Sequence, residues 1–255
     1  MQNPISISAV IITFNEERNI ERCLRSLQGI ADEMVVVDSF SGDRTEEICR
    51  SFGASFLKRA FTDYSDQKQW AAEQAHFDHI LSLDADEALS ETLRESILSV
   101  KNNWQADGYT FNRLTNYCGR WIYHCGWYPD AKLRLWNRNQ GRWNGLKIHE
   151  SVEMKPQATV AHLKGDLLHY SYYSIQQHRQ QIIKFTDMAA GELAEKGVTA
   201  SVAEAVIKSA WKFVRDYFFK LGFLDGSAGF TISRLSAYAT YLKYRKIIFL
   251  QKSNR

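Results

Sequence analysis

Strand-like and helix-like segments alternate through the first hundred residues of this chain. Four short apolar runs, each of the length of a buried strand, are followed by segments whose apolar residues have helical spacing. The runs cover residues 5–12, 34–38, 54–57 and 79–83. Such alternation is typical of a parallel sheet whose strands are joined by crossover helices, so the sequence predicts an α/β fold.

Two of the predicted strands end in acidic residues. Asp38 closes the second run, and Asp84, Asp86 and Glu87 close the fourth. Parallel strands present their carboxyl ends at one edge of the sheet, where open α/β folds bind ligands. Asp84 and Asp86 would point to the same side of a strand, about 7 Å apart, and could hold a hard divalent cation. The alternative is structural, with Asp86 as the N-cap of a helix over residues 89–100.

The turn after the first predicted strand is polar. It contains Thr13, Asn15 and Glu16, but neither the GxGxxG of dinucleotide-binding folds nor the P-loop pattern. Small polar side chains at this place could line a nucleotide. The structural alternative is that Thr13 or Asn15 caps the helix that follows.

The alternation stops after residue 100. Strands are expected at residues 108–114 and 131–136, within a region over 104–143 that is crowded with aromatic residues and interleaved with arginines. Aromatic rings can stack on sugars, and arginines can hold phosphates or carboxylates, although about half of these rings would be core residues. Nucleic acid could use the same mixture. The segment has no excess of positive charge that favours nucleic acid as a partner.

The C-terminal part is expected to be helical and is strongly basic. Helices are predicted over residues 174–196, 201–222 and 226–251. From Ala205 onward the chain has ten Lys and Arg against two Asp and Glu, a charge of +8, so the preceding 204 residues carry −5 of the total of +3. Basic helices with aromatic faces are typical of anionic membrane surfaces. The alternative is a helical cap that packs on the sheet.

Several classes of protein are disfavoured by the composition. The N-terminal segment lacks the basic and apolar regions of a signal peptide, and no uninterrupted apolar run reaches the length of a transmembrane helix. The four cysteines lack CxxC spacing, which disfavours a zinc site or a disulfide framework and indicates a cytoplasmic protein with reduced thiols.

Taken in order, these motifs make the chain resemble the family 2 glycosyltransferases of GT-A type. Within that family it is similar to the branch that adds glucose in β-1,4 linkage to the lipopolysaccharide inner core. The resemblance covers most of the chain and is carried by residues 12–16, 37–45, 83–87, 126–136, 148–150 and 168–170. It implies a GT-A domain over residues 1–172, with a mostly parallel central sheet, and a helical C-terminal region over residues 173–255.

The resemblance also implies a nucleotide site at the ends of the first strands. The residues expected to hold the nucleotide sugar are Thr13, Asn15, Glu16, Asp38, Lys68 and Asp84. Asp84, Asp86 and His169 are expected to ligate a divalent metal, Mn²⁺ or Mg²⁺, with Asp84 shared between the metal and the ribose.

Glu150 is the catalytic base that the resemblance implies. The wider family shows an Asp in a Glu-Asp pair at this place, whereas this chain has His149 and Glu150, so Asp130 remains a rival for the role. Trp127, Arg134 and Trp143 are the expected acceptor contacts.

The expected activity is an inverting transfer of a hexose, glucose in the first instance, from a UDP-sugar to a lipid-linked saccharide of the lipopolysaccharide core or another envelope glycan. The protein would work at the inner face of the cytoplasmic membrane, bound to its anionic surface, without nucleic acid. One alternative is a sugar nucleotidyltransferase, which normally has a Gly-rich loop after the first strand that this chain lacks. Another is a membrane-bound scaffold of the same fold without catalysis.

Overall fold

A computed structural model describes residues 4–146 and 150–253. The chain forms two compact units: Met1–Arg113 with Asp130–Tyr170, which we call the sheet unit, and Leu114–Pro129 with Ser171–Arg255, which we call the helical unit. The segment Leu114–Pro129 thus groups with the C-terminal helices. The domain boundary between residues 172 and 173 stays a prediction.

The central sheet has a parallel part and an antiparallel part. Its path runs β3-β2-β1-β4-β8-β6-β11-β5, and β7 pairs with β6. The strands are β1 (Ile7–Thr13), β2 (Glu33–Asp38), β3 (Ser55–Lys58), β4 (His79–Asp84), β5 (Glu87–Leu89), β6 (Gly108–Tyr117), β7 (Arg120–Ile122), β8 (Ala131–Asn137) and β11 (Val160–Tyr172). Strands β1 to β4 are parallel, and β8 pairs antiparallel with both β4 and β6. The predicted α/β class, with C-terminal helices, is confirmed.

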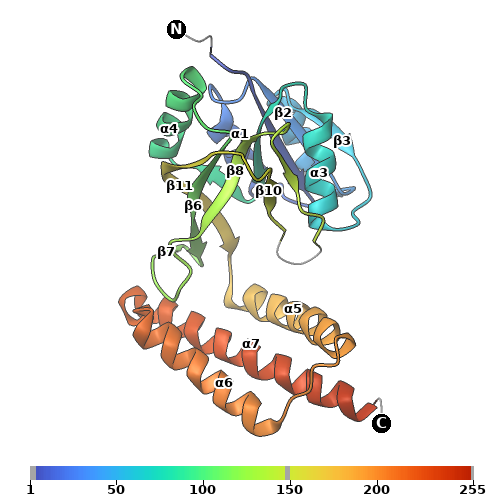
Figure 1. Cartoon of the computed structure of the whole chain (residues 1–255), viewed down its shortest axis with the longest axis vertical. Coiled ribbons are helices and arrows are strands. Elements are labelled where there is room, and N and C mark those ends of the chain that lie inside the picture. Colours follow the sequence, from blue (N-terminus) through green and yellow to red (C-terminus); the bar gives the residue numbers. More distant parts are fainter. Residues whose placement is uncertain (1–3, 147–149, 254–255) are drawn as a thin grey trace. The chain divides into compact units, whose positions relative to one another are not determined.

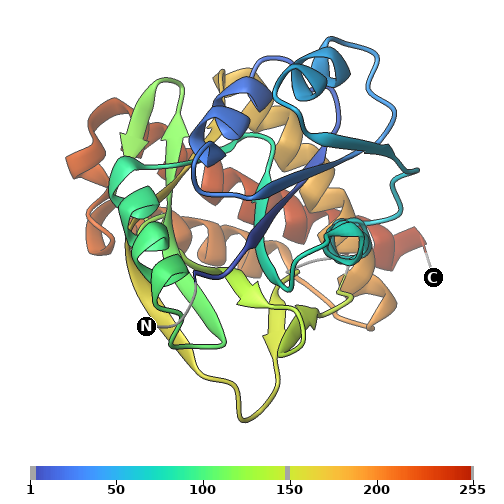
Figure 2. The ribbon, with the colours of Figure 1, turned by 90° about the horizontal axis from the view of Figure 1, so that it is seen from above.

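Helices cover both faces of the parallel strands because alternate residues of each strand point to opposite sides. The helices of the sheet unit are α1 (Ile20–Leu27), α2 (Thr45–Ser51), α3 (Tyr64–Gln74) and α4 (Glu91–Asn102). Ile7, Ala9 and Ile11 of β1 pack in one core with α1, α2 and α4, whereas Val10 packs in the other with α3. Figure 2 shows α3 end-on, on the other side of β1 from α1. These two cores hold the strand ends in fixed register.

The helical unit is built on one long helix. In Figure 1, α5 (Ile175–Glu195) and α6 (Val202–Val214) lie beside α7 (Gly226–Ser253), which packs against both. Ser174 caps α5 by a capping box with Gln177. Within the described residues, no helix combines the length and the apolarity needed to cross a lipid bilayer.

Two structural alternatives and one expectation about helix ends are wrong. Asp86 caps no helix, because the short strand β5 follows it and the Ser90 hydroxyl accepts from the backbone N–H of Leu93 to begin α4. Neither Thr13 nor Asn15 caps α1, whose first flanking residue is Asn19. The helix predicted to run to residue 222 ends at Val214.

The helical run leaves the α form after Val214 and turns sharply at Leu221 and Gly222. The chain continues as a π-helical turn, η1 (Arg215–Phe219), and a 3₁₀ turn, η2 (Gly222–Asp225). Leu221 has a left-handed backbone with φ 52°. A side chain at Gly222 would place its Cβ 2.8 Å from the carbonyl oxygen of Asp216, so the chain turns where only glycine fits.

The sequence analysis also missed several strands. β9 (Gly141–Trp143) and β10 (Val152–Met154) form a separate antiparallel ribbon, and with three residues each they show no periodicity. The 13 residues of β11 include Gly165, which interrupts the pattern of a strand.

Acid should destabilise the protein through His178. This side chain is buried in the helical unit, and burial lowers its pKa to about 4, whereas the unfolded chain takes up the proton near pH 6.5. Between these values the unfolded state binds more protons, so stability is lost as the pH falls. From about pH 7 to about pH 5 the free energy of unfolding should drop about 2 kcal/mol further in the native protein than in His178→Gln.

Denaturant titrations at the two pH values would measure this difference. Tyr117→Phe is the matched control, because it removes the hydroxyl that lies 3.1 Å from Nδ1 of His178 while leaving the ring buried. Its acid sensitivity should stay native. An equal acid response in the native protein and in His178→Gln would contradict the assignment.

Candidate active site

Three strands of the sheet unit end at one edge. Thr13, the last residue of β1, pairs with Asp38 at the end of β2, and Ile12 pairs with Asp84 at the end of β4. The predicted meeting of these strand ends is confirmed. The carboxyl edge of a parallel sheet is where open α/β folds form a ligand crevice.

The two loops at this edge are joined through Asn15. Its backbone N–H donates to Oγ of Ser41 over 2.7 Å, and its Oδ1 accepts from the N–H of Gly42 over 2.9 Å. Asp38 is fully buried, and its Oδ2 accepts from the N–H of Ser41 over 2.8 Å. Asn15 and Asp38 therefore hold the loop shape. Their contact with a nucleoside stays a prediction.

Glu16 lies close to the acids of β4. Its backbone N–H donates to Oγ1 of Thr45, and its side chain accepts from the amide of Asn19. Burial raises the pKa of Glu16, and the carboxylates of Asp86 and Asp84 raise it further. This position brings the predicted residues Glu16, Asp84 and Asp86 together.

A buried lysine links Asp84 to Glu150. Lys68 comes from α3 and is 1% exposed. Its Nζ lies 2.9 Å from Oδ1 of Asp84 and 3.3 Å from Oε1 of Glu150. The structure thus brings together Lys68, which was predicted to hold the nucleotide, Asp84, which was predicted to bind metal, and Glu150, the predicted base. His149, the neighbour of Glu150, lies outside the described residues.

The charges continue beyond Asp84 in alternating sign. Nη2 of Arg134 lies 3.3 Å from Oδ2 of Asp84 and 3.4 Å from Oε1 of Glu87. Arg113 then lies between Glu87 and Asp130, with Nη2 2.9 Å from Oδ2 of Asp130. We call this series the ion chain: Glu150, Lys68, Asp84, Arg134, Glu87, Arg113, Asp130 and Lys132. The two candidate bases, Glu150 and Asp130, stand near its opposite ends.

Both Asp84 and Arg134 stay charged in this setting. Burial raises the pKa of Asp84, but the attraction of Lys68 and Arg134 outweighs it and holds that pKa well below its usual range. Burial lowers the pKa of Arg134, and the carboxylates of Glu87 and Asp84 more than reverse this effect. Each charge is thus stabilised by the opposite charge beside it.

Trp143 borders the ion chain. Nζ of Lys68 lies 5.1 Å and Cζ of Arg134 5.6 Å from its ring centroid, within the range of cation–π attraction. Trp143 and Arg134 are each 5% exposed. Trp127 lies in the helical unit, where its ring packs against Tyr117. The acceptor roles of Trp127, Arg134 and Trp143 stay predictions.

Asp86 and His169 form a second pair. Oδ2 of Asp86 lies 3.2 Å from Nε2 of His169, and the N–H of Tyr170 donates to the backbone oxygen of Asp86. Strand β11 brings them together, because it places His169 opposite Glu87 of β5. Burial lowers the pKa of His169, but the Asp86 carboxylate raises it overall.

The pair fits a divalent ion that takes its other ligands from the substrate. Carboxylate oxygen and imidazole nitrogen suit Mn²⁺, and Mg²⁺ commonly binds one or two carboxylates together with phosphates and water. The residues that the structure describes contain no cluster of three or more His, Cys, Asp or Glu placed to hold an ion alone. Asp84 is engaged by two cations, so its part in metal binding stays a prediction.

The family model for glycosyl transferase family 2 matches residues 8–154, more than half of the chain. The chain belongs to this family. The match contains β1 to β10 and therefore the whole ion chain.

Relatives that are named as glycosyltransferases align over nearly the full chain. An uncharacterized glycosyltransferase of Rickettsia bellii is 31% identical over 94% of this chain and 85% of its own length. The lipopolysaccharide core biosynthesis glycosyltransferase LpsC of Rhizobium meliloti is 28% identical over 95% of this chain and 92% of its own. Among solved structures, glucosyl-3-phosphoglycerate synthase of Mycobacterium tuberculosis aligns over 44% of each chain, with 19% identity and a TM-score of 0.36.

Sequence reasoning missed several residues of this candidate site. Glu87 is 1% exposed, and its Oε2 accepts from the N–H of Asp84 over 2.9 Å, so it fixes the turn that carries both aspartates. Its position directly after Asp84 and Asp86 in the sequence could have indicated that Glu87 belongs to the same site. Arg113 and Lys132 also belong to the ion chain, since each lies 2.9 Å from an oxygen of Asp130. Nothing in the local sequence indicated these contacts.

Several buried polar atoms of the sheet unit lack a hydrogen-bond partner among the described residues. They include Oγ1 of Thr13, Oε1 of Gln67, Nη1 of Arg134 and Nε1 of Trp143. Such atoms are uncommon in native proteins, where buried polar groups are normally paired.

Removing the shared lysine should destabilise the sheet unit. Lys68→Met keeps the length of the side chain but deprives Asp84 and Glu150 of their common ammonium group. Loss of one partner from a buried pair should lower the free energy of unfolding by about 3 kcal/mol. Denaturant titration measures this change.

The exposed pair of Lys196 and Glu192 supplies the matched control, since 63% and 43% of these side chains are exposed. Lys196→Met should cost less than about 1 kcal/mol. Equal losses for the two lysine variants would contradict the buried ion chain. A double-mutant cycle with Asp84→Asn should give a coupling of at least about 1 kcal/mol.

Proposed function

We propose that this family 2 glycosyltransferase moves glucose from UDP-glucose to a lipid-linked saccharide of the lipopolysaccharide core, with inversion at the anomeric carbon. The observation that carries the proposal is the ion chain at the carboxyl edge of the sheet, beside the pair of Asp86 and His169. The core-biosynthesis relative LpsC supports the choice of acceptor.

The diphosphate of the donor would lie beside Asp86 and His169. These two side chains would hold the divalent ion, which supplies positive charge to the leaving diphosphate. Glu16 and Asp84 stand beside Asp86, so the negative charge of this corner matches a cation. Thr13 offers a buried, unpartnered hydroxyl at the end of β1 for the nucleotide.

Glu150 would act as the base. Its carboxylate accepts the proton of the acceptor hydroxyl while that oxygen bonds to the anomeric carbon and the bond to the diphosphate breaks. Lys68 holds Glu150 over 3.3 Å, which positions the carboxylate. Asp130 is more tightly engaged, with Arg113 and Lys132 each 2.9 Å away, and this favours Glu150 as the base.

Because the proposed acceptor is linked to a lipid, the enzyme would act at the inner face of the cytoplasmic membrane. The charge of +8 from Ala205 onward supports attachment to an anionic surface.

Replacing Asp86 should remove both catalysis and metal-dependent binding. In Asp86→Asn we expect transfer to fall about 10³-fold or more, because the charge that faces the ion is lost. Titration calorimetry should show UDP binding that no longer responds to Mn²⁺. Asp78→Asn, at an exposed aspartate paired with Arg138, should keep both properties.

A donor screen by mass spectrometry would establish the reaction. Glucosylated lipopolysaccharide core with release of UDP supports the proposal, whereas release of inorganic pyrophosphate from a nucleoside triphosphate would indicate a nucleotidyltransferase. Absence of any UDP binding with Mn²⁺ would indicate a scaffold.

The two candidate bases can be separated by amide variants. Glu150→Gln should lower kcat by about 10²- to 10⁴-fold with little change in donor binding. Asp130→Asn should retain most of the activity and mainly lower stability, because it leaves Arg113 and Lys132 without their carboxylate. The opposite ranking of kcat would assign the base to Asp130.

A further inference from the structure

The basic segment of the helical unit exposes almost no negative charge. From Ala205 onward its acids are Asp216 and Asp225, which are 1% and 7% exposed. Asp216 pairs with Lys212 over 2.6 Å, and Asp225 accepts from the backbone N–H of His124 over 2.9 Å. Asp216 also pairs with Arg215, whereas Lys220, Arg234, Lys243 and Arg245 form no ion pair among the described residues. These four side chains leave an excess of positive charge on the segment.

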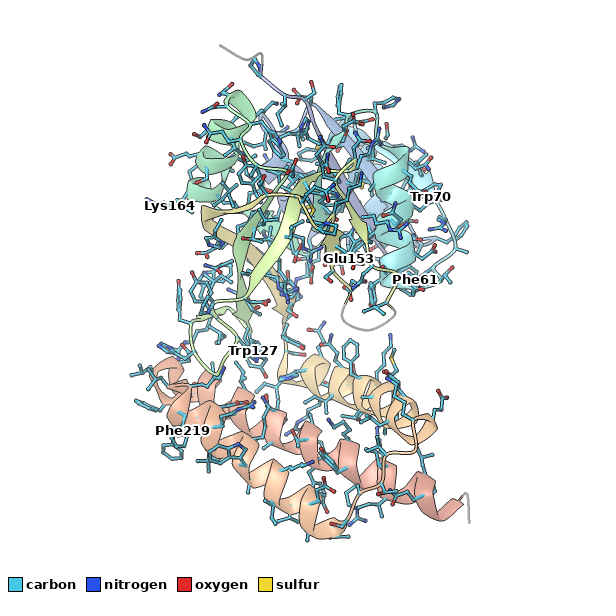
Figure 3. All side chains as sticks on the ribbon, viewed as in Figure 1. Phe61, Trp70, Trp127, Glu153, Lys164 and Phe219 are labelled. Carbon is cyan, nitrogen blue, oxygen red and sulfur yellow. The ribbon has the colours of Figure 1, made fainter. Side chains whose placement is uncertain are left out.

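Large apolar side chains gather on the outer side of α6 and the turns that follow. We call this surface the α6 ridge: Ile207, Trp211, Phe218, Phe219, Leu221, Phe223 and Leu224, each between 44% and 70% exposed. The rings of Trp211 and Phe219 lie 5.7 Å apart. Figure 3 shows Phe219 projecting outward from the helical unit. The residues of α6 and η1 that are buried are Ala205 and Asp216.

Aromatic packing beneath the α6 ridge holds its side chains in place. The ring of Tyr217 lies 5.2 Å from that of Phe218, 6.2 Å from Phe223 and 5.7 Å from Phe230. Gly222 and Gly229 allow the turn and α7 to meet closely, since a Cβ on Gly229 would lie 1.8 Å from the carbonyl oxygen of Gly222. A surface fixed in this way loses little conformational freedom when it binds.

We propose that the α6 ridge inserts into the interfacial region of an anionic membrane and that the surrounding lysines and arginines bind its headgroups. This inference rests on the proposed function, which places the enzyme at a membrane. It adds that the α6 ridge is the part of the chain that contacts the lipid. Aromatic and aliphatic side chains beside basic residues match the boundary between acyl chains and anionic headgroups. A second copy of the ridge fits less well, because a symmetric contact would bring the same positive charges together.

Vesicle flotation with the full chain tests this inference. The double variant Phe219→Ser with Leu224→Ser should lower partitioning into phosphatidylglycerol-containing vesicles by about 20-fold or more, since two inserted side chains are lost. Both residues are exposed, at 70% and 58%, so the fold should tolerate the changes. High salt should weaken binding of the native protein by a similar factor.

Phe249→Ser is the matched control. Phe249 is also 70% exposed, but it lies on α7 about 35 Å along the helix from Gly226. Its partitioning should stay within about two-fold of native. Brominated lipids should quench the tryptophan fluorescence of the native protein. Trp211→Phe should remove the share of this quenching that comes from Trp211.

Native vesicle binding by the double variant would overturn the inference, as would equal binding to neutral phosphatidylcholine vesicles. If sedimentation shows a dimer that the double variant dissociates, the ridge is an interface between copies instead. UDP binding with Mn²⁺ should be native in every ridge variant, whereas failure of the proposed function would appear as absent UDP binding in the native protein.

Discussion

The site depends on charges that are buried only because each has a partner. Lys68 and Arg134 are almost fully buried, and either one would be very costly in the core without a carboxylate beside it. Asp84 meets both cations, and it lies at the end of the central strand β4. The position of α3, through Lys68, and that of β8, through Arg134, are thus tied to one residue.

The ion chain brings side chains from many elements of the sheet unit to the carboxyl edge of the sheet. Residues from α3, β4, β5, β6 and β8, and from the segments before β8 and β10, contribute to the ion chain, although they are far apart in sequence. Each contributes one charge, and the alternation of sign keeps neighbouring charges attractive. A fixed array of this kind can stabilise charge that develops during a reaction without first having to reorganise.

The sequence revealed the parallel half of the fold and the sheet edge at which the strand-end acids meet, for a physical reason. Buried parallel strands are continuous apolar runs, and Asp38 and Asp84 stand out at their ends. Partners that come from distant segments are not visible in this way: nothing near Lys68 in the chain indicates Glu150, and Arg113 looks like an ordinary surface residue. The sharp turn at Leu221 and Gly222 was also hidden, because it depends on the approach of Gly222 to a carbonyl group in the folded chain.

One nitrogen atom, Nζ of Lys68, serves two carboxylates that have different proposed tasks. Any positive charge that comes to rest near Asp84 weakens the attraction of Asp84 for this ammonium group and leaves more of it for Glu150. Conversely, neutralisation of Glu150 frees the ammonium group for Asp84. The electrostatic attraction at each carboxylate therefore depends on the charge of the other, through the ammonium group that they share.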